Sequence, residues 1–192
     1  MARVPFIDPE DLPEEYRHLV HSRLGKPVNV RRAMANHPEA LSQVAGPAQW
    51  FQTGAELDAR LRELALLQLG YVTANGYEFS HHVVISAASG VTDDDIRAVI
   101  ADTRGEPNEL SALERAVLRA TRTLTSDLEI DESTWAELER ALGRKVAMEL
   151  VLLVAHYNYL VRVIAALQID LEPEYEEHLA RFDPPAWAGA WR

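Results

Sequence analysis

The sequence predicts an all-α protein, a single-domain helical bundle. Apolar residues recur at three- and four-residue spacing through most of the 192 residues, and valine and isoleucine seldom alternate with polar residues. The length suits one domain with a substantial core. We expect the helical domain to span residues 1–182, with a core motif at about 56–102 and a second helical part at about 109–172. Residues 183–192 form a tail that contains proline and tryptophan.

The N-terminal part predicts two helices. The first runs from about Pro9 to Arg23 and opens with acidic residues, which suit a helix N-terminus. The second begins near Pro38, because proline is well tolerated in the first helical turn. Gly46-Pro47 should kink or split this second helix.

The middle of the chain predicts a pair of helices joined by a tight turn. An apolar stripe runs from Glu56 to about Thr73, and Asn75-Gly76 then ends the helix. The next helix starts near Tyr77 and ends at Gly90, a residue that readily adopts the left-handed cap conformation. The short turn makes the two helices probable antiparallel neighbours.

Four more helices are expected after this pair. Thr92 and Asp95 resemble a capping box, so a short helix runs to about Asp102. Residues 105–108 are a connecting loop, and two amphipathic helices follow at about 111–124 and 133–142. The last and longest, Arg144 to about Gln168, is apolar on nearly all faces, which predicts a central or interface helix. We therefore expect a homo-oligomer: a dimer, a trimer or a hexamer.

Composition excludes several classes of function. The formal net charge is -11, and no run of lysine and arginine resembles a phosphate-binding surface, so nucleic acid and anionic membranes are not expected partners. No stretch resembles a signal peptide or an uncharged transmembrane helix, which predicts a cytoplasmic location. The absence of cysteine excludes disulfides and thiol-based redox chemistry within the chain.

One constellation of side chains predicts chemistry. Glu78 and His82 are four residues apart and so project from one helix face, where the carboxylate can orient the imidazole for general acid–base work. Glu63 on the preceding helix can bring a second carboxylate to the same ring. The amides of Tyr77 and Glu78, at a helix N-terminus, suit a developing oxyanion.

Other polar residues near this constellation have two readings. Arg62 either binds a substrate carboxylate or makes a structural ion pair. His81 points about 100° away from His82 and is expected at a surface or interface. His156 is a pocket wall or a satisfied core residue. Trp50 and Phe51 can line the pocket but are more typical of core aromatics.

No metal or cofactor is expected. The spacings of Glu63, Glu78, His82 and His156 match no dedicated metal-ligand motif. Glycine-rich phosphate loops and a serine nucleophile elbow are absent from the sequence.

The segment LRELALLQLGYVTANGYEFSHHVVISAASGVTDDDI resembles the carboxymuconolactone decarboxylase-like family of the alkylhydroperoxidase-like superfamily. The likeness rests on Arg-Glu in one helix, then Tyr-Glu-aromatic, then a histidine eight residues before glycine. It extends to SALERAVLRATRTL and MELVLLVAHYNYLVRVIAALQIDLE, and so covers about residues 35 to 172. The resemblance implies an oligomeric helical bundle of the alkylhydroperoxidase-like type.

The redox members of this superfamily carry Cys-x-x-Cys-x-x-x-His with a relay glutamate on the helix before. Aligned on His82 and Gly90, that pattern puts the relay carboxylate at Glu63 and the two cysteines at Asn75 and Glu78. Both thiols are missing here. The resemblance therefore transfers the fold and the pocket, and it argues against thiol peroxidase activity.

These observations predict a cofactor-free lyase or proton-transfer enzyme that acts on a small carboxylated lactone or another enolisable acid. His82, Glu78 and Glu63 are the expected catalytic residues, and Arg62, Tyr77, Asn75 and His156 are the expected substrate-binding residues. The alternative is a non-catalytic ligand-binding or assembly protein that keeps the fold without the redox cysteines. The sequence does not name the substrate, because function belongs to the site rather than the fold.

Overall fold

A computed structural model describes residues 1–22 and 24–182 of the chain. The tail at 183–192, with its two tryptophans, lies outside the described residues. In the described part every regular element is helical, and the extended pairing seen there is an isolated bridge between His21 and Pro27. The all-α class expected from the sequence is confirmed.

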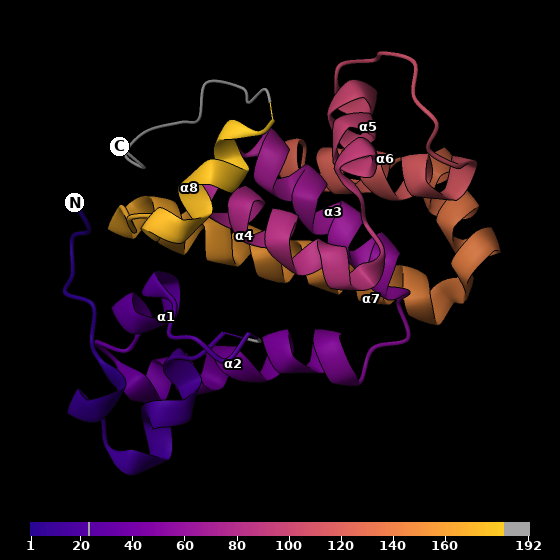
Figure 1. Cartoon of the computed structure of the whole chain (residues 1–192). Helices are drawn as coiled ribbons and strands as arrows, with labels where there is room; N and C mark the ends of the chain where they lie inside the picture. Colours follow the sequence, from indigo (N-terminus) through magenta and orange to yellow (C-terminus); the bar gives the residue numbers. More distant parts are fainter. Residues whose placement is uncertain (23, 183–192) are drawn as a thin grey trace.

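The helices divide into an N-terminal layer and a larger body (Figure 1). The N-terminal layer contains η1 (Pro9–Asp11), η2 (Glu14–Val20), α1 (Asn29–Met34) and α2 (Pro38–Thr53). The body contains α3 (Ala59–Val72), α4 (Gly76–Ser86), η3 (Ala87–Ser89), α5 (Asp93–Thr103), α6 (Ala112–Ser126), α7 (Glu132–Leu167) and α8 (Pro173–Ala180). Helix α3 is central, because it packs against α4, α5, α6 and α7.

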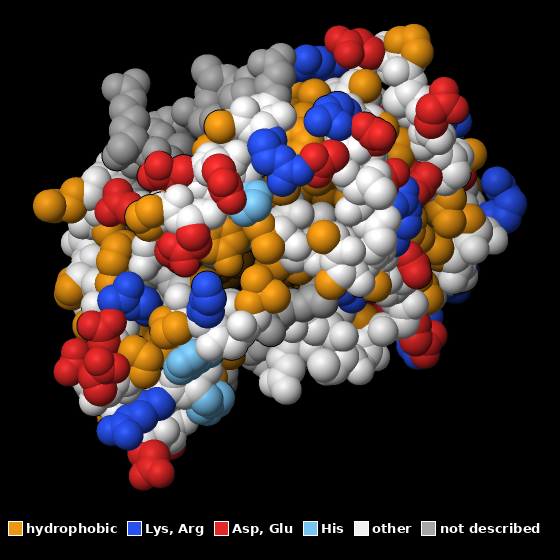
Figure 2. Space-filling view, in the orientation of Figure 1, with side chains coloured by type: hydrophobic (Ala, Val, Ile, Leu, Met, Phe, Trp, Pro, Cys, Tyr) orange, Lys and Arg blue, Asp and Glu red, His pale blue; other side chains and the backbone are white. Residues whose placement is uncertain are grey.

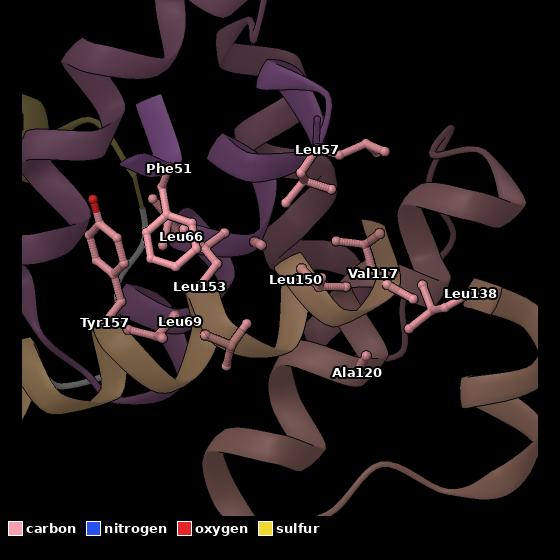
Figure 3. Close-up of a cluster of buried hydrophobic side chains, with 14 of the residues drawn as sticks. Phe51, Leu57, Leu66, Leu69, Val117, Ala120, Leu138, Leu150, Leu153 and Tyr157 are labelled. Carbon is pink, nitrogen blue, oxygen red and sulfur yellow. The ribbon is translucent and has the colours of Figure 1, made fainter. Parts of the chain in front are cut away.

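The largest apolar cluster holds α3, α6 and α7 together and reaches the N-terminal layer through Phe51 (Figure 3). Leu66, Leu69 and Leu153 are at most 1% exposed, so burial of apolar surface is the main contribution to the stability of this part. Tyr157 lies beside Phe51 at one end of the cluster, and its hydroxyl points away from the apolar side chains (Figure 3).

The α3–α4 hairpin depends on a close approach of two backbones. A Cβ atom on Gly70 would lie 2.9 Å from the backbone nitrogen of Phe79 and 3.0 Å from its Cα. Any side chain at Gly70 would therefore push α4 away from α3. The turn between the helices uses Ala74 in the left-handed region, with φ 50°. This packing sets the distance between residues on the facing sides of α3 and α4.

Asn75 fixes the beginning of α4. Its side-chain oxygen accepts a hydrogen bond from the Glu78 amide at 2.9 Å, as an N-cap does, and its Nδ2 donates to Val161 O on α7 at 3.3 Å. One side chain thus anchors the helix that carries Glu78 and His82 to both its own turn and α7.

Helix α7 has a non-helical residue near its start and two different faces. Gly143, with φ 79° and ψ 155°, interrupts it at the boundary that the sequence predicted between two helices. Leu150, Leu153 and Ile164 are buried, whereas Met148 and Leu152 are each 48% exposed. By length and composition alone α7 could cross a membrane, but a core helix passes the same test, so this is weak evidence.

The helices differ from the sequence-based expectation at three places. Residues 9–20 form two short 3-10 helices instead of one α-helix, because Pro13 lacks an amide hydrogen and Leu12 before it is extended. Helix α2 continues through Gly46-Pro47 without a split. Helices α1 and α8 were not expected; both are short, and neither has a side-chain N-cap hydrogen bond.

Candidate active site

His82 lies between two carboxylates, one at each ring nitrogen. Its Nδ1 is 2.7 Å from Glu63 Oε2, and its Nε2 is 3.0 Å from Glu78 Oε1. The Glu63 contact is a well-formed hydrogen bond, whereas Glu78 Oε1 is close enough for an ion pair but makes no aligned hydrogen bond. The spacing of Glu78 and His82 on α4, with Glu63 on the neighbouring α3, produces the arrangement expected from the sequence.

Arg62 completes the support of Glu63. Its Nε and Nη2 atoms both lie 3.2 Å from Glu63 Oε1, and its Nη1 donates to Phe51 O at 3.2 Å. Because its donors are used in this way, the role that suits Arg62 is a structural ion pair, the second of the two readings given above. The pair is buried, which makes its loss costly.

The two carboxylates determine the charge of His82. Burial lowers the pKa of His82, but the charges of Glu63 and Glu78 and the hydrogen bond with Glu63 outweigh burial and raise this pKa to about 10. The imidazole is therefore protonated at neutral pH. The resting site holds an imidazolium between two carboxylates, so a proton is stored next to a carboxylate that can pass it on.

A cavity of about 90 Å³ opens beside this group. Its wall comes from both layers of the fold, with Arg31 on α1 and Phe51 on α2 facing Glu63, Glu78 and His82 on α3 and α4. This volume is below that of ordinary ligand pockets, so only a compact molecule fits. The N-terminal layer forms one wall of the cavity, and the α3–α4 hairpin contributes Glu63, Glu78 and His82.

His81 was expected at a surface or interface, and this was wrong. It is 7% exposed, its Nε2 lies 2.8 Å from Glu172 Oε2, and its ring is stacked between Tyr77 and Tyr175 at centroid distances of 4.4 and 3.8 Å. The reason is α8, which packs against α4 on the side that the isolated helix would leave to solvent.

Glu172 gathers several groups behind the cavity wall. It accepts from the Tyr77 hydroxyl at 2.9 Å and from the Asn29 amide at 2.6 Å, in addition to its contact with His81. Burial would raise the pKa of Glu172, but its bonds with His81 and Asn29 lower it, so it stays ionised. This cluster ties α1, α4 and the start of α8 to one another.

The expected substrate-binding residues are distributed unequally. Tyr77 and Arg62 line the cavity. Asn75 does not, because its side chain caps α4, and the Glu78 amide that it holds is not free for an oxyanion. His156 lies in a neighbouring recess lined by residues of α1, α2 and α7, and its ring is tilted against that of Phe51 at a centroid distance of 5.8 Å. These two residues and that amide are therefore unsupported as substrate contacts.

The sequence did not identify two of the residues that line the cavity. Arg31 lies on the short helix α1, which no strong pattern predicts, and the sequence gave Tyr157 only a packing role. The ring of Tyr157 contacts His82 edge-on at a centroid distance of 5.6 Å. The sequence offers only a weak indication of the role of Arg31, which is an arginine beside the apolar Val30 in a segment with no strong helical pattern.

The possibility of a metal site was also considered. Within residues 1–22 and 24–182, no group of three or more histidine and carboxylate side chains has an arrangement that could hold a metal ion. Both ring nitrogens of His82 already face carboxylates.

The space-filling view shows acidic and basic side chains interspersed over the face seen in Figure 2. Several of these charges pair across elements, as Arg60 does with Asp95 and Glu114 at 2.6 and 3.0 Å. Arg60 thus joins α3 to α5 and α6 outside the cavity.

Comparison with solved structures identifies the fold. The chain is similar to a cysteine-to-alanine variant of the debrominase Bmp8 in complex with 2,3,4-tribromopyrrole, with a TM-score of 0.80 and 18% identity over 95% of this chain and 100% of that one. It is also similar to a peroxidase-related protein with an alkylhydroperoxidase AhpD core from Ralstonia eutropha JMP134, with a TM-score of 0.78 and 16% identity over 91% and 94%. A peroxidase-related protein from Silicibacter sp. TM1040 gives a TM-score of 0.72 and 21% identity over 92% and 93%.

These structures define the class as an alkylhydroperoxidase-like helical fold. The model of the Carboxymuconolactone decarboxylase family matches residues 35–122, which contain Glu63, Glu78 and His82. The match places residues 35–122 of the chain in this carboxymuconolactone decarboxylase-like family. No curated protein matches the sequence.

Proposed function

We propose that the protein is a cofactor-free proton-transfer enzyme, decarboxylase-like, that acts on a small carboxylated lactone or another enolisable acid. The observation that carries the proposal is the position of His82 between Glu63 and Glu78 at the wall of a small cavity. A buried ionisable group with a strongly raised pKa beside a cavity is typical of acid–base sites.

The three groups have different tasks in this proposal. Glu63, fixed by Arg62, holds the Nδ1 proton and keeps the ring charged. Glu78 faces Nε2 and is the carboxylate through which the second ring proton reaches the substrate. From the sequence we expected His82 to carry the proton, with Glu78 orienting the ring and Glu63 tuning it. The distances favour Glu63 as the orienting partner and a shared task for His82 and Glu78.

The proton balance of a decarboxylation fits this arrangement. The carbon–carbon bond to the leaving carboxylate breaks, carbon dioxide departs, and the electron pair remains as an enolate. The His82–Glu78 pair then supplies one proton to the enolate carbon, and water restores it. A positioned acid–base group contributes about a hundredfold to ten-thousandfold in rate.

Thiol chemistry is not part of the proposal. The similar debrominase structure is a variant in which a cysteine was replaced, and the peroxidase-related neighbours share only the fold at their level of identity. This chain contains no cysteine, so it has no thiolate to attack a peroxide or a carbon–halogen bond.

The test is a screen of the purified protein against carboxylated lactones and β-keto acids. Carbon dioxide release and deuterium incorporation at the acidic carbon in heavy water are both measured. We expect one compound class to turn over, and His82→Ala and Glu78→Gln to lower its rate by about a hundredfold or more. Glu177→Gln, at an exposed glutamate on α8, is the matched control and should keep the rate.

The outcome that contradicts the proposal is equally concrete. Absence of both carbon dioxide release and deuterium exchange across the panel, with folded protein that still binds the acids, would favour the non-catalytic binding protein. His81→Ala does not serve as a neutral control, because His81 is buried against Glu172 and lines the cavity.

A further inference from the structure

We propose that Arg31 and Tyr157 form an anion-binding site that holds the carboxylate of a small acid with a compact apolar body, in the cavity that Glu78 also lines. This inference rests on the proposed function only in orienting the acid toward Glu78. Binding of the carboxylate itself requires no turnover.

Arg31 lacks a carboxylate partner in the part of the chain that the structure describes. Its Nη1 donates to two backbone carbonyls, His21 O at 2.5 Å and Leu19 O at 3.4 Å. Other partly buried arginines have acidic partners; Arg60 binds Asp95 and Arg122 binds Asp102. Burial lowers the pKa of Arg31, so its cation is held in an unfavourable environment that a bound anion would relieve.

Tyr157 supplies a second donor at the same place. Its hydroxyl has no hydrogen-bond partner among the described residues, and it points away from the apolar cluster (Figure 3). Burial raises the pKa of Tyr157 well above the physiological range, so the hydroxyl stays neutral and can donate. Arg31 and Tyr157 both line the cavity and the neighbouring recess, so the two groups lie near each other.

The charge balance of the cavity favours a monoanion. Glu63 and Glu78 carry two negative charges, and protonated His82, Arg62 and Arg31 carry three positive charges. The charges of Glu63, Glu78, His82 and Arg62 cancel within the buried cluster, so the remaining positive charge is that of Arg31. A surplus cation inside a chain with a net charge of -11 is a local feature that the overall composition does not reveal.

The surroundings determine which acid fits. The cavity of about 90 Å³ limits the ligand to a small ring or a short chain. Arg31 and Tyr157 also line the neighbouring recess, whose wall includes apolar residues of α2 such as Val44 and Ala48. A carboxylate held at these two residues lies in the cavity that Glu78 lines and next to the apolar surface of the recess. The matching ligand is a small monocarboxylate with an apolar ring.

The test compares an acid with its neutral isostere. Binding of cyclopentanecarboxylate and cyclopentanecarboxamide is measured by calorimetry for the wild type, Arg31→Gln and Tyr157→Phe. Arg97→Gln and Tyr16→Phe are the matched controls, because Arg97 is an exposed arginine on α5 and Tyr16, on η2, lines neither the cavity nor the recess. Circular dichroism confirms that each variant is folded.

We expect the wild type to bind the acid at least about tenfold more tightly than the amide, the value of one charge-assisted contact. Arg31→Gln should remove this preference, Tyr157→Phe should reduce it about threefold, and both controls should keep it. A purely structural Arg31 would weaken acid and amide equally. If Arg31→Gln does not fold, Arg31→Lys and Tyr157→Phe decide, since lysine keeps the charge but lacks the planar donor fork.

A wild type that binds both compounds equally, or neither, overturns the anion site, and so does a folded Arg31→Gln protein that keeps the preference. The failure of the proposed function looks different. In that case the acid preference depends on Arg31, but no acid exchanges its proton or loses carbon dioxide.

Discussion

Substitution of Glu63 by glutamine tests the electrostatic basis of the site. The change keeps the size of the side chain but removes the carboxylate charge 2.7 Å from His82 Nδ1. It also leaves the Arg62 guanidinium, which now lies 3.2 Å from Glu63, without a negative partner. Both effects disfavour the imidazolium.

The expected magnitude follows from the geometry. An ion pair at about 4 Å between charge centres is worth about 4 kcal/mol at an effective dielectric constant of about 20, or about 3 pKa units. Two carboxylates would therefore raise the pKa of His82 by about 6 units, and burial would lower it again in part, which agrees with the value of about 10. Removal of Glu63 should lower the pKa to about 7 or below. Glu78→Gln should have a smaller effect, because Arg62 stays paired with Glu63.

The assay is a pH titration of the ¹⁵N-labelled imidazole rings by NMR, with the His82 signals assigned by their loss in His82→Gln. Turnover at neutral pH should fall in Glu63→Gln by less than in Glu78→Gln, because Glu63 tunes the imidazole and Glu78 passes on the proton. If His82 in Glu63→Gln still titrates near pH 10, or if wild-type His82 titrates near its ordinary value of 6.5, the reasoning is refuted.

Three further predictions concern the fold. The pKa of His82 in the folded state lies above its unfolded value of 6.5, so the stability that this proton contributes is complete below pH 6.5 and is lost as the pH rises toward 10. The melting temperature of the wild type should therefore fall between pH 6.5 and pH 10, and the melting temperature of His82→Gln should fall less. Gly70→Val should lower the free energy of unfolding by about 2 kcal/mol or more, because the valine Cβ would clash with the Phe79 backbone. Urea denaturation measures this free energy, and an unchanged denaturation midpoint would show that α3 and α4 are not closely packed. The homo-oligomer stays a prediction, supported by Leu152 and Met148, each 48% exposed on α7; sedimentation of a clean monomer at micromolar concentration would contradict it.

The arrangement around His82 shows how much local sequence can determine. The four-residue spacing of Glu78 and His82 fixes their shared helix face whatever surrounds them. The Asn75-Gly76 turn makes α3 and α4 neighbours, which brings Glu63 within hydrogen-bond distance. Cap residues acted in the same local way, since the Thr92–Asp95 capping box starts α5 and Gly90 ends the preceding helix in the left-handed region. The cytoplasmic location and the domain boundaries stay predictions of the sequence.

Contacts between segments far apart in the chain determine the surroundings of His81 and Arg31. His81 is one helical step from His82, and the isolated helix leaves it to solvent, but α8 and Glu172, about ninety residues later, bury it. Arg31 lines the cavity because the N-terminal layer packs against the body. No residue pattern within α1 predicts this packing. The role of a side chain depends on local spacing when its partner is within one or two helical turns, and on tertiary packing when its partner comes from a distant segment. For this reason the sequence alone predicted the grouping of Glu63, Glu78 and His82, and only the tertiary structure placed Arg31 at the same cavity.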